Sequence, residues 1–181
     1  MFFDLLDYIL GEVKLIIYKS FYRKKMQYHF YSKFSRSFQL RIFNKGEFLA
    51  GKNIVIRSGV KIRINGNGKV ILGDDIGLNN NCLLNSMDRI KIGAHTIIGQ
   101  DVKMYDHDHD YKKEGNRRYT GFKTEPIEIG ENVWIGSGCI ILKGTVIGDN
   151  CVVAAGTVVR GIIPENSLVH NEINVINKII N

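Results

Sequence analysis

The sequence has few of the residues that mark several common classes of protein. Two prolines stand beside 19 glycines in 181 residues, which favours short strands with tight corners over long proline-bounded loops. The three cysteines, Cys82, Cys139 and Cys151, are odd in number and form no Cys-x-x-Cys motif. This count argues against a disulfide framework or a zinc knuckle, so we expect a reducing compartment, the cytoplasm.

Long apolar runs are also missing. No stretch of about 18 apolar residues occurs, so we predict no membrane-spanning helix. Acidic residues are fewer than basic ones, 18 against 25, which gives a net charge of +7. Residues 1–50 carry +5 of this charge, because they hold nine Lys and Arg against four Asp and Glu. The rest of the chain is nearly neutral and shows no nucleic-acid recognition motif, so we expect no nucleic-acid partner.

The N-terminal residues show an amphipathic pattern. Apolar residues recur at helical spacing from Phe2 to Phe21, and charged residues interrupt them, so a cleavable signal peptide is not expected. Basic and aromatic residues alternate from Tyr18 to Tyr31. Two interpretations stay open. The helix packs on the domain or on a sister subunit, or residues 1–31 dock on an anionic membrane, which would place the protein at the inner face of the cell membrane.

A six-residue repeat governs most of the chain. Its first position is apolar at Ala50, Ile56, Ile62, Leu72, Leu78, Leu84, Ile92, Ile98, Met104, Ile129, Ile135, Ile141, Ile147 and Val153. Each hexad predicts one short strand and one corner, and three such faces close a triangular coil whose strands pair in parallel. We expect position one to point inward and position five, where all three cysteines fall, to hold a small buried residue.

The hexads carry a family resemblance. With the stretches Val133 to Ser137, Ile147 to Asn150 and Ala154 to Val159, they resemble the hexapeptide-repeat acyltransferases, and within them the maltose, galactoside and colanic-acid O-acetyltransferases. The resemblance implies an all-β fold, a left-handed parallel β-helix, with acetyl-CoA as co-substrate and a homotrimeric assembly. We expect a helical, basic extension at 1–48, the β-helix at 49–165 and a C-terminal tail at 166–181.

One long insertion, residues 105–127, breaks the repeat. A loop of this length inside a tight repeat is uncommon unless it is functional. It carries His107 and His109. Acetyl transfer from a thioester to a hydroxyl needs a base of near-neutral pKa, which imidazole supplies, and donors for the oxyanion. The resemblance places the general base at His109, counted from Val102, in preference to His107.

The resemblance also implies the remaining site residues. Asn79 falls on an asparagine of the family and, with His107 and Tyr105, would position the acceptor or support the oxyanion. The acid that orients the imidazole stays open between Asp108, Asp110 and a more distant carboxylate. The expected coenzyme path is lined by Trp134, Gly136, Ser137, Ala155 and Arg160.

The His-Asp-His-Asp run of the insertion also resembles a metal site. Imidazoles and carboxylates two residues apart lie on one face of a strand, as metal ligands require. The third ligand would have to be His95, which falls on a corner of a different coil. We therefore predict that no metal is bound.

The resemblance implies an acetyl-CoA-dependent O-acetyltransferase that acts on a sugar hydroxyl in the biosynthesis of a bacterial surface polysaccharide, such as a capsule, an O-antigen or an exopolysaccharide. The acceptor stays open between a free sugar, a sugar nucleotide and a lipid-linked saccharide. The alternatives are an N-acetyltransferase for an amino sugar nucleotide, an antibiotic acetyltransferase, and a non-catalytic β-helix scaffold recruited to the membrane.

Overall fold

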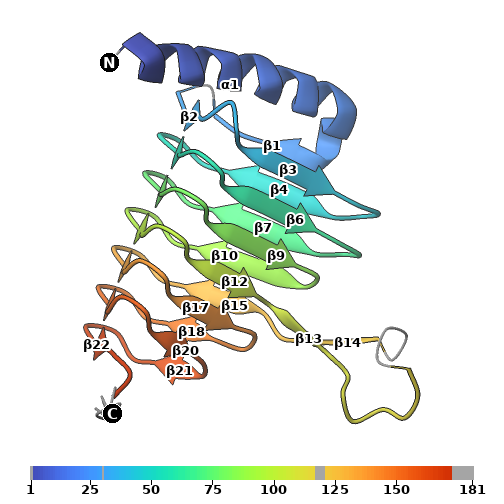
Figure 1. The fold of residues 1–181 in the computed structure, drawn as a ribbon, viewed down its shortest axis with the longest axis vertical. Helices are drawn as coiled ribbons and strands as arrows, with labels where there is room; N and C mark the ends of the chain where they lie inside the picture. Colours follow the sequence, from blue (N-terminus) through green and yellow to red (C-terminus); the bar gives the residue numbers. More distant parts are fainter. Residues whose placement is uncertain (1, 30, 117–120, 173–181) are drawn as a thin grey trace, which may run out of the picture.

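The computed structural model describes residues 2–29, 31–116 and 121–172 and shows a solenoid of short parallel strands with one helix across its N-terminal end (Figure 1). Helix α1 (Phe2–Tyr22) continues into the short 3₁₀ helix η1 (Arg23–Lys25). Of the helices in the described part of the chain, none has the apolar length needed to cross a membrane.

The strands stack into three flat faces, and the chain visits the faces in a fixed order. The first face consists of β1 (Met26–Gln27), β4 (Glu47–Ala50), β7 (Lys69–Leu72), β10 (Arg89–Ile92), β15 (Ile127–Ile129), β18 (Val146–Ile147) and β21 (Ile162–Ile163). The second consists of β2 (Lys33–Phe34), β5 (Val55–Ile56), β8 (Gly77–Leu78), β11 (Ile97–Ile98), β16 (Trp134–Ile135), β19 (Val152–Val153) and β22 (Leu168–Val169). The third consists of β3 (Gln39–Ile42), β6 (Lys61–Ile64), β9 (Leu83–Ser86), β12 (Lys103–Tyr105), β17 (Ile140–Leu142) and β20 (Val158–Val159).

The register of the strands confirms the six-residue repeat. Leu78, Ile98, Ile135 and Val153 pair in successive coils of the second face. Every position-one residue from Ile56 to Val153 is at most 2% exposed, and the three cysteines are fully buried. The repeat therefore builds the core of the prism from one inward column on each face, with a second column of small residues beside it.

The solenoid is longer than the repeat pattern predicts. Its first coil begins at β1, so the boundary expected between residues 48 and 49 lies inside the second coil, and only residues up to Lys25 are helical. At the other end, β22 extends the solenoid to Val169, beyond the expected limit of 165. The six-residue pattern did not predict the first coil, because the buried positions of this coil hold Phe34 and Phe38 in place of isoleucine and lack the isoleucine-glycine spacing.

The long insertion forms an antiparallel hairpin. Strand β13 (His107–His109) pairs with β14 (Phe122–Thr124), and the hairpin leaves the prism between β12 on the third face and β15 on the first (Figure 1). Residues 117–120 of this insertion lie outside the described part of the chain. The hairpin is thus the main departure from the solenoid at the corner between the third and first faces.

Candidate active site

A buried aspartate anchors the hairpin to the solenoid. Asp106 lies between β12 and β13 and is fully buried. Its carboxylate accepts hydrogen bonds from Ser86 Oγ at 2.7 Å and from the backbone N–H groups of Met87 at 2.8 Å and Asp88 at 2.9 Å. Burial alone would raise the pKa of Asp106, but these bonds and the one from His107 outweigh it, so the pKa is lowered.

His107 is held in one orientation by this carboxylate. Its Nδ1 lies 2.9 Å from Asp106 Oδ1, and its side chain is only 11% exposed. The ring also meets Phe122 edge-on, with the centroids 5.4 Å apart. A carboxylate at Nδ1 keeps the proton on that nitrogen and leaves Nε2 as the acceptor, which is the arrangement of an oriented general base.

His109, two residues further along the same strand, is more exposed. Its ring stacks at a tilt on Phe122, with the centroids 4.5 Å apart. It lines a cavity of about 200 Å³ whose walls are rich in cations. The lining residues are Asp108, His109, Tyr111, Lys112, Lys123, Lys143 and Arg160. An imidazole among four cationic side chains suits a substrate with phosphate groups.

Two ion pairs stabilise the hairpin, one between its strands and one at its base. Lys123 Nζ lies 3.2 Å from the carboxylate of Asp110, so these residues join the two strands. Lys143, which is largely buried at the end of β17, pairs with Glu125 at the base of β14. The hydrogen bond and the charge of Lys143 lower the pKa of Glu125. These contacts hold the cavity beside the solenoid.

The structure separates the predicted site residues into two groups. Tyr105, His107, His109 and Arg160 lie where the third face ends, at the corner that carries the hairpin. Tyr105, at the end of β12, is half-buried and aligned between Asn85 and Leu142 of the neighbouring coils. Arg160 therefore lies with the histidines and not with the other residues of the expected coenzyme path.

The second group stacks at the opposite corner, before the third face begins. Asn79 follows β8 and donates its side-chain amide to Ile98 O at 3.0 Å. Ser137 Oγ accepts the N–H of Gln100 at 3.2 Å. Gly136 is packed so closely on the next coil that a Cβ there would lie 2.6 Å from the backbone nitrogen of Ala155. Trp134 in β16 points outward beside Ile97 and is 57% exposed. Within one chain, the third face separates these residues from His109.

The geometry also shows what the sequence pattern missed. The acid that holds an imidazole is Asp106, and it holds His107, whereas the sequence left the acid that orients His109 open between Asp108, Asp110 and a more distant carboxylate. Strict alternation from the buried Met104 would have pointed Asp106 inward, above Ser86 of the preceding coil.

The structure separates His95 from the hairpin. His95 lies at the corner between the first and second faces, where its Nδ1 is 3.4 Å from Asp75. Across the described ranges, no group of three or more His, Cys, Asp or Glu side chains is placed to hold a metal ion.

Parallel coils with a histidine-bearing hairpin at one corner define the class of the hexapeptide-repeat transferases. A family model described as bacterial transferase hexapeptide (six repeats) matches residues 126–161. WbbJ of Escherichia coli K12, provisionally named an O-acetyl transferase of lipopolysaccharide biosynthesis, is 30% identical over 73% of this chain and 71% of its own. The chain therefore belongs to the hexapeptide-repeat acetyltransferases, and it is an acyltransferase.

Two solved structures show the same fold. A maltose O-acetyltransferase from Clostridium difficile 630 is 27% identical, with a TM-score of 0.58 over 90% of this chain and 75% of its own. The hexapeptide-repeat acetyltransferase VCA0836 of Vibrio cholerae, solved with acetyl coenzyme A, is 26% identical, with a TM-score of 0.55 over 91% and 81% of the two chains. Each likeness covers about nine-tenths of this chain.

Proposed function

We propose that this protein transfers the acetyl group of acetyl-CoA to a sugar hydroxyl during the biosynthesis of a bacterial surface polysaccharide. The observation that carries the proposal is the pair of imidazoles on one hairpin, His107 fixed by a buried carboxylate and His109 facing a cation-lined cavity. Acetyl coenzyme A in VCA0836 supports the donor, and the name of WbbJ supports a polysaccharide acceptor.

In the proposed reaction, His109 is the general base. It removes the proton of the sugar hydroxyl as the oxygen attacks the thioester carbonyl, and the tetrahedral intermediate then expels the thiolate of coenzyme A. The imidazolium returns its proton to that thiolate, so the products are the acetyl ester and free coenzyme A. His107, Tyr105 and Asn79 position the acceptor or support the oxyanion. Lys143 and Arg160, on the wall beside His109, offer their charges to the phosphates of the coenzyme.

We further propose that the active unit is a homotrimer. Within one chain, Asn79, Gly136, Ser137 and Ala155 lie across the third face from His109. A neighbouring prism that presents this corner to the hairpin would complete the site, with Trp134 as an outward wall for the pantetheine arm. The proposed location is the cytoplasm, on the side of the membrane where acetyl-CoA is made.

The test of the chemistry is acceptor-dependent release of free thiol from acetyl-CoA, measured with a panel of free, nucleotide-linked and lipid-linked sugars. We expect His109→Ala to lower kcat by at least about a hundredfold, the usual scale for losing a general base. His95→Ala is the matched control, because His95 is an exposed histidine at a different corner, and it should keep the rate within about twofold.

The variant His107→Ala distinguishes the roles of the two histidines. His107→Ala should reduce kcat less than His109→Ala if His107 only positions the substrate. A larger loss for His107→Ala would move the base to His107, and a wild-type rate for His109→Ala would refute its assignment. The assembly is tested by mixing inactive His109→Ala and Asn79→Ala chains, which should recover part of the activity. An active enzyme with a monomeric mass in solution would overturn the shared site.

A further inference from the structure

Helix α1 packs on the solenoid with a side that combines small and apolar residues with hydrogen-bonding ones. Gly11 and Leu15 are buried against the first coil, and a Cβ at Gly11 would lie 1.6 Å from the carbonyl oxygen of Phe34. Tyr22 Oη donates to Leu40 O at 3.4 Å and accepts the N–H of Ile42 at 3.3 Å. These backbone groups belong to β3, the edge strand of the third face, whose unpaired N–H and C=O groups need partners.

Lysines on the same side complete this cover of the solenoid edge. Lys19 donates to the carbonyl of Met26 in β1, the edge strand of the first face. Lys14 donates to Arg36 O at 2.9 Å, and the carboxylate of Asp7 accepts the backbone N–H of Arg36 at 3.3 Å. The helix therefore uses its charged and aromatic residues to close the end of the prism.

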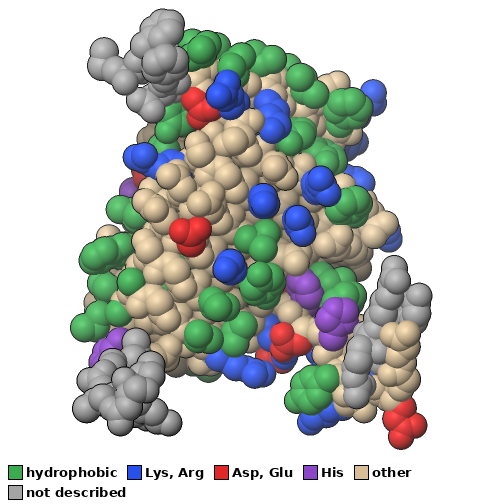
Figure 2. Space-filling model, viewed as in Figure 1, with side chains coloured by type: hydrophobic (Ala, Val, Ile, Leu, Met, Phe, Trp, Pro, Cys, Tyr) green, Lys and Arg blue, Asp and Glu red, His purple; other side chains and the backbone are tan. Residues whose placement is uncertain are grey.

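The opposite side of α1 is apolar and faces away from the solenoid. We call this side the outward face, and its residues are Leu5, Leu6, Ile9, Leu10, Val13, Ile16, Ile17 and Phe21. Each of these side chains is between 40% and 80% exposed. Apolar side chains follow the upper edge of the molecule in Figure 2, where α1 lies. A continuous apolar face of this size marks an interaction site, because single exposed apolar residues are scattered on ordinary surfaces.

The charge around the outward face is entirely positive over a long stretch of chain. No Asp or Glu occurs between Glu12 and Glu47, whereas nine Lys and Arg do. Arg23, Lys24 and Lys25 follow the helix directly and are exposed. They line, with Phe21, Tyr22 and Ile42, an open hollow of about 570 Å³ at the end of the helix. Apolar and cationic groups thus meet at one edge of the face.

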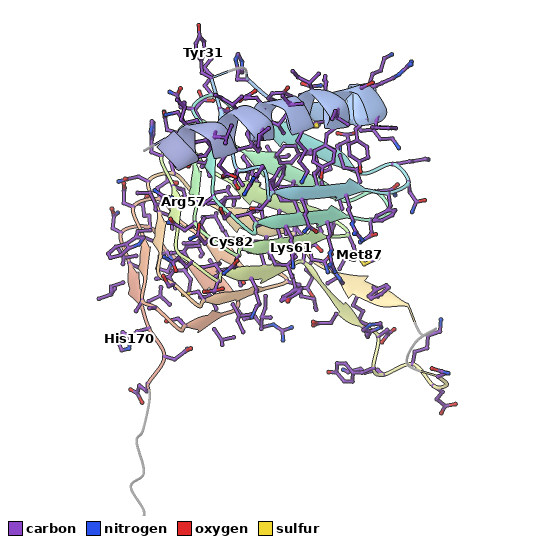
Figure 3. All side chains as sticks on the ribbon, turned by 45° about the horizontal axis from the view of Figure 1, so that its top comes forward. Tyr31, Arg57, Lys61, Cys82, Met87 and His170 are labelled. Carbon is purple, nitrogen blue, oxygen red and sulfur yellow. The ribbon has the colours of Figure 1, made fainter. Side chains whose placement is uncertain are left out.

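A tyrosine extends this surface. Tyr31 is 79% exposed and projects from the loop between β1 and β2, on the side of the molecule where α1 lies (Figure 3). Tyrosine favours the boundary between lipid headgroups and acyl chains, because its ring is apolar and its hydroxyl is polar.

From this arrangement we infer that α1 docks flat on an anionic lipid bilayer. The outward face enters the boundary between headgroups and acyl chains, and the basic turn Arg23–Lys25 binds the anionic headgroups. A second copy is the weaker occupant, because parallel pairing would bring two basic turns together, and in antiparallel pairing the described acids of α1 are a poor match: Asp7 is already paired with Arg36 and Glu12 is half-buried. This docking does not depend on the acetyl transfer.

The test is flotation of the full chain with vesicles of phosphatidylcholine alone or with about 30% phosphatidylglycerol. The wild-type protein should bind the anionic vesicles at least about tenfold more tightly than the neutral ones. The double variant Val13→Asp/Ile16→Asp should lose at least about a hundredfold in affinity, because two apolar side chains leave the lipid and two anions enter. Both positions are exposed, so the circular dichroism spectrum should not change.

The charge contribution has its own variant and control. Lys24→Gln/Lys25→Gln should weaken binding about thirtyfold, because each basic residue near an anionic surface contributes about 1 kcal/mol. Lys91→Gln/Lys103→Gln removes two exposed lysines from the coil of β10 to β12, in the middle of the solenoid, and should leave binding within about twofold.

Three outcomes would overturn the inference. Vesicle binding could be absent, or it could be equal for neutral and anionic vesicles. The protein could also bind no vesicle and instead self-associate further as its concentration rises. If Val13→Asp/Ile16→Asp abolished that association, the outward face would be assigned to a second copy.

Discussion

The coils and the hairpin are held in place by different kinds of contact. In the coils, neighbouring backbones touch: a Cβ at Gly99 would lie 2.6 Å from Ser137 N, and one at Gly93 would lie 2.4 Å from Gly130 O. In the hairpin, a Cβ at Gly115 or Gly121 would meet nothing within 4 Å. The hairpin is fixed by side chains, so its position depends on a few bonds, whereas the coils are fixed along their whole length.

The largest predicted effect breaks the backbone contact between coils. We expect Gly99→Val to destabilise the protein by at least about 3 kcal/mol, because the new side chain collides with the backbone of the next coil, which cannot move aside. Urea unfolding followed by circular dichroism measures the loss.

The matched control is Gly77→Val on the same face. Gly77 lies in β8, and a Cβ there would meet nothing within 4 Å. A β-branched side chain fits an exposed strand position, so Gly77→Val should change the stability by less than about 1 kcal/mol. Equal losses for the two variants would show that close packing at the corner does not limit the coil.

The second prediction releases the hairpin and leaves the coils intact. Asp106→Ala removes the acceptor of four hydrogen bonds and leaves the half-buried N–H groups of Met87 and Asp88 without this partner, so we expect a loss of about 2–3 kcal/mol. It should also lower kcat about tenfold, because His107 loses its orientation while His109 keeps its imidazole. Asp108→Ala, on the exposed side of β13, should cost less than about 0.5 kcal/mol.

The hydrogen bonds to the Asp106 carboxylate also make part of the folding stability dependent on pH. The pKa of Asp106 is lowered in the folded protein, because hydrogen bonds to its carboxylate outweigh the effect of burial. Its contribution is therefore complete above the ordinary aspartate pKa of about 4 and is lost as the pH falls through the lowered, folded-state pKa. Wild type and Asp106→Ala should differ most in unfolding free energy near neutral pH and converge in acid. A constant difference down to about pH 2 would contradict the assignment.

The six-residue period of the sequence predicted the solenoid, because each hexad favours the same local structure, a short strand and a tight corner. Position-one residues from Ile56 to Val153 face inward as expected, since a β-branched residue followed by a small one suits a short strand and a tight corner. The first coil could not be predicted this way. Phe34 and Phe38 of the first coil, with Phe48 of the second, fill the core under α1, where it must match a helix and not another coil.

The site was only partly predictable, for a physical reason. A motif and its spacing predict which residues carry chemistry, such as His107 and His109. They do not predict which carboxylate lies behind an imidazole, because that depends on how Asp106 packs against Ser86 of the coil before it. The sequence also did not predict which side of α1 faces the solenoid. The side that carries Leu15 and Tyr22 points inward, because Leu15 fills the core and the edge strands of the first coil need hydrogen-bond partners.

The smallest predicted effect uses thiol chemistry to compare the coils with the hairpin. Cys82, Cys139 and Cys151 are fully buried, and burial raises the pKa of the Cys82 thiol to about 11. Since only the thiolate attacks a disulfide reagent, the native protein at pH 8 should show no rapidly reacting thiol. Glu114→Cys adds a thiol at an exposed hairpin position, and this thiol should react more than about a hundredfold faster than the native cysteines.

The buried thiols should react only at the rate at which the coils open. Adding Gly99→Val to Glu114→Cys should therefore raise the reaction rate of the native cysteines and leave that of the hairpin thiol unchanged. Fast labelling of a native cysteine in the folded wild type would show that the coils open as readily as the hairpin.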